Sequence, residues 1–144
     1  RSAFTLVEIL IVVVILGILA AIVVPALSHA TTEAQAEATY SDLQKMRRAI
    51  GVYRAREGAI PPITEVENDP DASWGPLVGQ EGEYMKTSPI NAWVGGQNGK
   101  RVVVIENYVP DDAYQTDAGW IFDPISGELY AGSFDAEDRP NPRN

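Results

Sequence analysis

The sequence of 144 residues contains no cysteine and only one histidine, His29. The absence of cysteine excludes disulfide frameworks, thiolate zinc sites, iron–sulfur clusters and cysteine nucleophiles. One histidine leaves little for acid–base catalysis at neutral pH. No nucleophile and base lie together on a recognisable motif, so we do not expect an enzyme. Basic residues are scarce in residues 57–144, which hold five Lys/Arg against sixteen Asp/Glu. Because phosphate binding needs a basic face, nucleic acid is not expected as a main partner.

The net charge of −9 conceals two unlike halves. Residues 1–56 carry a charge of +2 and hold 33 of the 65 apolar residues. Residues 57–144 carry −11 and hold 19 of the 22 Gly and Pro residues. This division predicts an apolar segment joined to an acidic, loop-rich domain.

An uninterrupted apolar run extends from Ile9 to Leu27 and contains fourteen Ile, Leu and Val residues. These residues favour membrane insertion by about −6 kcal/mol on an insertion scale. A helix of this length nearly spans a hydrocarbon core of about 30 Å. Gly17 and Pro25 weaken that helix, because glycine has low helix propensity and proline lacks a backbone donor. A cleavable secretory signal is the alternative, but the run is long for one and an acid precedes it.

Glu8 stands at the leading edge of this run. A carboxylate inside a membrane costs up to about 3 kcal/mol, so a plain anchor has no use for one. The position indicates a cationic partner for Glu8. The alternative is that the carboxylate lies in the headgroup layer without a special role.

The stretch Phe4-Thr5-Leu6-Val7-Glu8-Ile9-Leu10, the apolar run, and the Gly17 and Pro25 positions resemble the N-terminal signature of type IV pilins and type II secretion pseudopilins. The resemblance implies cleavage by a prepilin peptidase between Ala3 and Phe4, followed by N-methylation of Phe4. Ala3 stands where the family usually has glycine, and residues 1–3 are then a leader remnant or an uncertain terminus.

The same resemblance assigns roles in assembly. It implies that Glu8 pairs with the N-terminal ammonium of a neighbouring subunit. It also implies that the stretch from Gly17 to Pro25 unwinds in the filament, which agrees with its weak helix propensity.

Beyond the apolar run, the helix is expected to continue to about Arg56, so that it begins at Phe4 and is followed by Gly58 and a proline pair. Its second half is amphipathic, with an apolar stripe at spacings of three and four residues formed by Leu43, Met46, Ile50 and Tyr53. We expect this stripe to pack on the C-terminal domain; a seam to another subunit is the alternative. The chain is thus divided into a terminus (1–3), a transmembrane or filament-core helix (4–27), its amphipathic second half (28–57) and an acidic domain (58–144).

Strands are predicted at residues 102–105, 119–123 and 128–131, the last two joined by the Pro124-Ile125-Ser126-Gly127 turn. We expect a small antiparallel sheet packed on the helix, an α+β fold like that of pilins. The resemblance also implies a calcium site near the C-terminus, because major pseudopilins often bind calcium there. Asp135, Glu137 and Asp138 have oxygen ligands of the right kind, although a solvated acidic tail is the simpler interpretation of these residues.

The expected function is that of a structural subunit of a type IV pilus-like filament, which forms from copies of the chain. Subunits are expected to reside in the inner membrane before the prepilin peptidase and the assembly machinery bring them into a cell-surface filament. Two alternatives stay open. One is a major-type pseudopilin of a type II secretion system, in a periplasmic filament. The other is a single-pass anchored binding module that does not polymerise.

Overall fold

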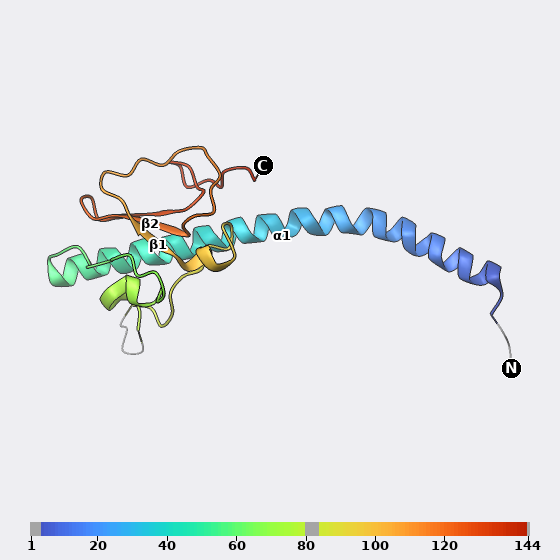
Figure 1. Ribbon diagram of the computed structural model, residues 1–144, viewed down its shortest axis with the longest axis horizontal. Coiled ribbons are helices and arrows are strands. Elements are labelled where there is room, and N and C mark those ends of the chain that lie inside the picture. The colour runs from blue at the N-terminus through green and yellow to red at the C-terminus, as the bar shows by residue number, and fades with distance from the viewer. Residues whose placement is uncertain (1–3, 80–83, 144) are drawn as a thin grey trace. The chain divides into compact units, whose positions relative to one another are not determined.

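The computed structural model describes residues 4–79 and 84–143, so the predicted processing residue Ala3 lies outside the described residues. One long helix, α1 (Leu6–Glu57), is followed by two 3₁₀ helices, η1 (Ala72–Leu77) and η2 (Gln97–Lys100). Three strands complete the chain: β1 (Val102–Val104), β2 (Trp120–Asp123) and β3 (Glu128–Ala131) (Figure 1). The contacts divide the chain into two compact units, Arg1–Ala34 and Gln35–Asn144, which are described separately below.

The first unit contains the beginning of α1, which starts two residues later than the sequence predicts. Phe4 and Thr5 precede the helix, and the Thr5 hydroxyl accepts a hydrogen bond from the backbone N–H of Glu8 at 3.2 Å. Threonine followed three residues later by glutamate is the sequence of a capping box. A capping residue keeps a non-helical backbone, which explains why the helix begins at Leu6.

The end of α1 agrees with the prediction to within one residue. Gly58 follows the helix with φ of 68°, and its N–H donates to the carbonyl of Arg54 at 3.0 Å. A residue in this left-handed conformation closes a helix by pairing one of the last carbonyls, and glycine adopts it without steric cost.

In the second unit, the predicted apolar stripe of α1 forms the centre of the hydrophobic core. Leu43, Met46 and Ile50 are buried, and Tyr53 is half-buried against the same cluster. They join residues from η1, the sheet and the loops, namely Ile63, Trp74, Leu77, Val78, Trp93, Val102, Trp120, Phe122, Leu129, Ala131 and Phe134. The prediction that the stripe packs on the C-terminal domain is confirmed.

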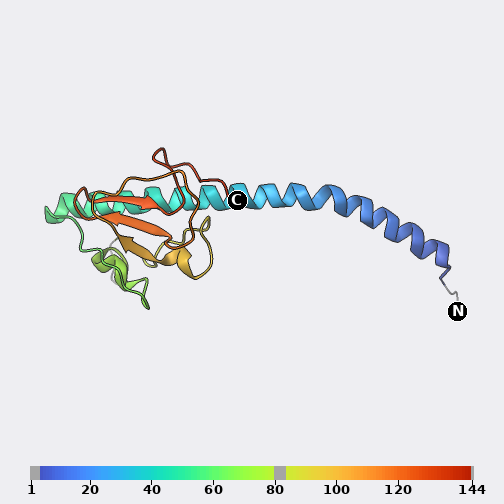
Figure 2. The ribbon, with the colours of Figure 1, turned by 45° about the horizontal axis from the view of Figure 1, so that its top comes forward.

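The sheet has the strand order β1-β2-β3 and covers this part of α1, as Figure 2 shows. Strands β2 and β3 form the predicted antiparallel hairpin, with Ile121 opposite Tyr130. The prediction that the whole sheet is antiparallel is wrong, because β1 pairs with β2 in parallel, with Val103 opposite Ile121. Residues 105–119 connect the two strands. This connection is long enough to bring the chain back to the end of the sheet at which β1 begins, as parallel pairing requires. The α+β class itself is confirmed.

A buried amide fixes the loops around this sheet. Asn91, fully buried, donates to the carbonyl oxygens of Gly119 and Gly132 at 2.8 and 3.0 Å. Its oxygen accepts the N–H of Val94 at 2.9 Å and the hydroxyl of Thr39 at 3.4 Å. The side chain therefore connects α1, the start of β2 and the end of β3. Because a buried polar group is costly unless it is paired, this set of bonds specifies one arrangement of the loops.

Candidate functional site

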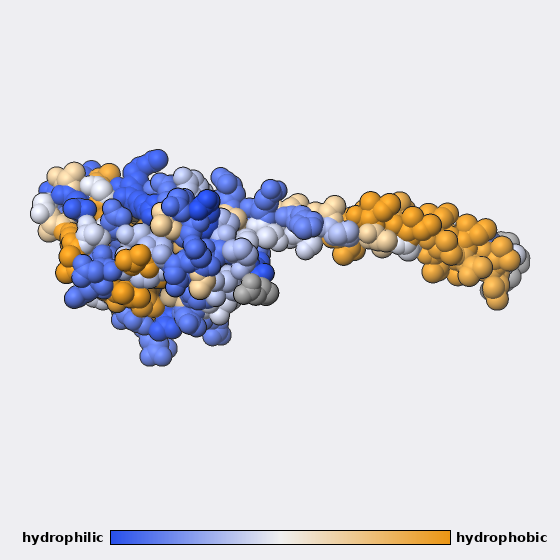
Figure 3. All heavy atoms as spheres, turned by 90° about the horizontal axis from the view of Figure 1, so that it is seen from above, coloured by the Kyte–Doolittle hydropathy of each residue, from blue (hydrophilic) through white to orange (hydrophobic). Residues whose placement is uncertain are grey.

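The apolar surface of α1 in the first unit is exposed on every side. Each of the seventeen large apolar side chains between Phe4 and Leu27 is half or more exposed. Figure 3 shows this surface as an unbroken hydrophobic region on the face in view. The helix is long and apolar enough to cross a membrane. Monomeric soluble proteins rarely expose so much contiguous apolar surface, so this segment needs lipid or other protein around it.

Glu8 lies in the first turn of α1 and is exposed, as is Phe4 before it. The helix dipole favours a carboxylate at this end, because the first backbone N–H groups carry partial positive charge. Glu8 therefore has a local role at the helix start, together with Thr5. Its side chain is exposed, so a cation from outside the chain can reach the carboxylate.

Gly17 and Pro25 lie inside an unbroken helix, so neither interrupts α1 in the isolated chain. Apart from its two chain neighbours and the adjacent backbone of the helix itself, no atom lies within 4 Å of the position that a Cβ on Gly17 would occupy. The glycine is therefore not required by packing within the chain. Pro25 removes one backbone donor from the helix, which leaves the carbonyl of Ala21 without its usual partner. The weakness predicted for this stretch stays a prediction.

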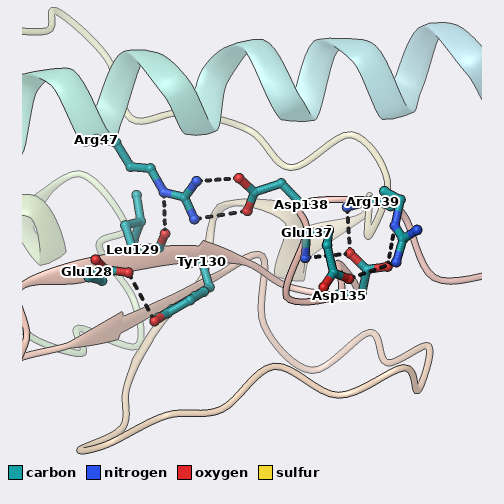
Figure 4. Close-up of polar contacts among 8 residues, drawn as sticks. All are labelled: Arg47, Glu128, Leu129, Tyr130, Asp135, Glu137, Asp138 and Arg139. Carbon is teal, nitrogen blue, oxygen red and sulfur yellow. Dashed lines mark hydrogen bonds and ion pairs between the residues drawn. The ribbon is translucent and has the colours of Figure 1, made fainter.

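The three candidate calcium ligands lie in one loop, residues 135–139, which we call the acidic loop. Figure 4 shows that their carboxylates point to arginines. Asp138 forms a two-bond ion pair with Arg47, one of them between Nη2 and Oδ1 at 2.9 Å. Asp135 and Glu137 both pair with Arg139, at 2.8 and 2.7 Å. Within residues 4–79 and 84–143, no three histidine or acidic side chains lie close enough to share a metal ion.

The electrostatics of the acidic loop follow from these contacts. Burial raises the pKa of Asp135, but the backbone N–H of Arg139, its guanidinium and the N–H of Glu137 outweigh burial and hold that pKa below its usual range. Burial also raises the pKa of Tyr130, and the neighbouring carboxylate of Glu128 raises it further. Asp135 is thus charged at neutral pH and paired with Arg139.

A cavity of about 510 Å³ lies between the second half of α1 and the β2–β3 hairpin. Its charged lining is mixed, with Arg47 and Arg54 opposite Glu128 and Asp138. Arg54 also donates a long bond of 3.4 Å to the carbonyl of Ser126. This lining of both charges selects no particular class of ligand.

Sequence reasoning missed two residues that these sites depend on. The capping role of Thr5 was readable from the threonine and glutamate spacing at the start of α1. The role of Arg47 was not readable, because its partner Asp138 lies 91 residues further along the chain. A long-range ion pair leaves no local pattern in a sequence.

Comparison with known proteins supports this picture of the first unit and extends it. Residues 1–24 match the prokaryotic N-terminal methylation motif. The type II secretion system core protein G of Aeromonas hydrophila is 33% identical over 97 residues, which cover 65% of this chain and 68% of that protein. This chain belongs to the family of type II secretion system core protein G. The core proteins G of Pseudomonas aeruginosa and Klebsiella michiganensis are each 32% identical, over 65% and 66% of this chain and 68% and 70% of theirs.

Membership in the core protein G family confirms the resemblance to pilins and pseudopilins. It favours the secretion alternative over the expected type IV pilus, which is a correction within one superfamily. No solved structure matches the chain significantly.

Proposed function

We propose that this core protein G relative is the structural subunit of a type II secretion filament and polymerises through the N-terminal part of α1. The observation that carries the proposal is the apolar surface between Phe4 and Leu27, exposed on every side. Before assembly the inner membrane covers this surface, and after assembly the same helix of other subunits covers it. The helix must be apolar all round because it has no side that stays in water.

Glu8 sets the register of assembly in this proposal. A prepilin peptidase cuts between Ala3 and Phe4, and the new amino group of one subunit pairs with the Glu8 carboxylate of another. Its position at the start of α1 supports the proposal, since the carboxylate is exposed there. Inside a bundle of apolar helices, an unpaired carboxylate is costly, so only registers that pair it are stable.

The experiment compares two glutamates on the same helix, Glu8→Gln and Glu37→Gln. Each variant is produced in cells that assemble the secretion system, and sheared filaments are quantified by immunoblot beside secretion of a substrate protein. We expect Glu8→Gln to lower the filament yield at least about tenfold, since each tenfold corresponds to about 1.4 kcal/mol and an unpaired buried charge costs more. Glu37→Gln should match the wild type. An undiminished yield with Glu8→Gln contradicts the role of Glu8.

Two further measurements separate the proposal from its alternatives. Mass analysis of the mature N-terminus reports whether the chain is cut before Phe4 and methylated. Electron microscopy of cells at normal expression separates a short periplasmic filament from a pilus, because a pilus gives long surface fibres that carry this chain. A membrane-anchored module that never polymerises gives no filament even when the chain is overproduced.

A further inference from the structure

The acidic loop offers a test of whether calcium fits this chain. Calcium takes six to eight oxygen ligands that converge on one point, about 2.3–2.6 Å from it. Asp135, Glu137 and Asp138 are close in sequence, so convergence depends on the direction of each carboxylate. In the structure they point in two directions, as Figure 4 shows.

Asp135 has both carboxylate oxygens in use. One oxygen accepts the backbone N–H groups of Glu137 and Arg139 at 3.0 and 2.9 Å. The other accepts Nε of Arg139 at 2.8 Å, and the same guanidinium reaches Glu137 through Nη2 at 2.7 Å. The Arg139 guanidinium thus lies between two of the three carboxylates, in the place where a shared cation would have to lie.

Asp138 is turned away from the other two carboxylates. Its backbone is in the left-handed region, with φ of 59°, and its carboxylate faces Arg47 on α1. Arg47 also donates Nε to the carbonyl of Leu129 at 2.9 Å. One guanidinium therefore joins α1, β3 and the acidic loop.

We infer that Arg47 and Arg139 take the place of a calcium ion in this chain, so that the folded domain does not depend on calcium. Two fixed positive charges neutralise most of the loop's three negative ones. Arg47 also holds the loop on the helix by directional bonds, since arginine binds a carboxylate through two parallel N–H groups. Arg139 joins Asp135 to Glu137 within the loop. The residues present do not fit a calcium ion, whatever filament the chain forms.

The first test measures the unfolding temperature of the full chain in detergent micelles, in millimolar calcium and in excess EGTA. Near-UV circular dichroism of the buried tryptophans follows the domain. We expect the same unfolding temperature in both solutions. A calcium site with a dissociation constant near ten micromolar would raise it by about 10 °C in millimolar calcium. A fall of several degrees in EGTA overturns the inference.

The second test compares two adjacent arginines of α1, Arg47→Gln and Arg48→Gln, of which Arg48 is exposed. Arg47→Gln should lower the unfolding temperature by several degrees in calcium and EGTA alike, while Arg48→Gln leaves it unchanged. If Arg47→Gln does not fold, Arg139→Gln replaces it, because that side chain is 69% exposed and its removal leaves the core intact. An unchanged unfolding temperature in the substituted variant overturns the inference, as does recovery of the lost stability on adding calcium.

Discussion

The two ends of α1 are built from the same apolar residue types but use them in opposite ways. Leu16 is 58% exposed, and Leu43, on the same helix, is fully buried. The first belongs to a unit that has nothing of its own to pack against, and the second lies in the core of the domain. Helix formation and apolar composition alone therefore do not decide burial. Burial depends on whether the chain supplies a partner surface, and for the first unit that surface must come from outside.

Leucine truncation should show the difference between the two parts of α1 most strongly. Leu43→Ala removes a fully buried side chain and should lower the free energy of unfolding of the domain by about 2–5 kcal/mol. Leu16→Ala should leave it unchanged within about 0.5 kcal/mol, because that side chain contributes nothing to the core. Denaturant titration of the full chain in micelles measures both. Equal effects of the two substitutions would mean that the units do not differ in this way.

Removal of the buried amide should have the next largest effect. Asn91→Ala removes the side-chain donor to the Gly132 carbonyl and one of the two donors to the Gly119 carbonyl, which keeps the N–H of Gly132, and should cost about 2–3 kcal/mol. Asn98→Ala is the matched control, because Asn98 donates one exposed bond, to the Thr116 carbonyl, and its loss should cost less than about 1 kcal/mol. The two free energies of unfolding are measured in the same way. If Asn98→Ala lowers the free energy of unfolding as much as Asn91→Ala does, the buried amide of Asn91 has no special role in stabilising the domain.

Two glycines of α1, one in each unit, allow the same comparison to be made for helix stability. Gly17 and Gly51 both have room for a Cβ, so alanine should stabilise the helix by up to about 1 kcal/mol at either position. Gly51→Ala should raise the free energy of unfolding of the domain. Gly17→Ala should instead slow amide hydrogen exchange between residues 17 and 25 and leave domain unfolding unchanged. Unaltered exchange in Gly17→Ala would show that this stretch is not the weak part of the helix.

Acid should lower the stability of the domain, and the contribution of each single carboxyl group should be the smallest of the predicted effects. The Ser88 hydroxyl holds the pKa of Asp71 below its ordinary value of 3.8, against burial and with help from the Ser88 N–H. A carboxyl whose pKa is lower in the folded state stabilises the fold above about 3.8, and that stability is lost as the pH falls through the folded value. Asp135 has the same sign.

The unfolding temperature of the domain should therefore fall as the pH drops below about 3.8. Asp71→Asn and Ser88→Ala should each flatten that fall, because each removes the same hydrogen bond. A pH profile identical to that of the wild type in both variants would contradict the assignment.

The features that are best predicted from the sequence are those set by residues close to one another along the chain. The extent of α1, its apolar stripe and the β2–β3 hairpin follow from periodicity, a terminal glycine and a four-residue turn. The partner of β1 does not follow, because its pairing with β2 depends on the path of residues 105–119. The direction of Asp138 does not follow either, since it is set by Arg47 from a distant part of the chain. Signals that couple distant residues are absent from local patterns.

The position of the core stripe near the beginning of the chain has a consequence for folding. During synthesis Leu43 and Met46 are made long before Leu129, which covers the same core. The last described residues are also needed, because the Trp93 indole donates to the carbonyl of Asn141 at 3.1 Å and Arg143 lies over its ring. Contacts of such high sequence separation slow folding and delay it until residues as far along the chain as Arg143 have been made. Until then, the chain emerging from the ribosome exposes the stripe of Leu43, Met46 and Ile50 in addition to the apolar surface between Phe4 and Leu27.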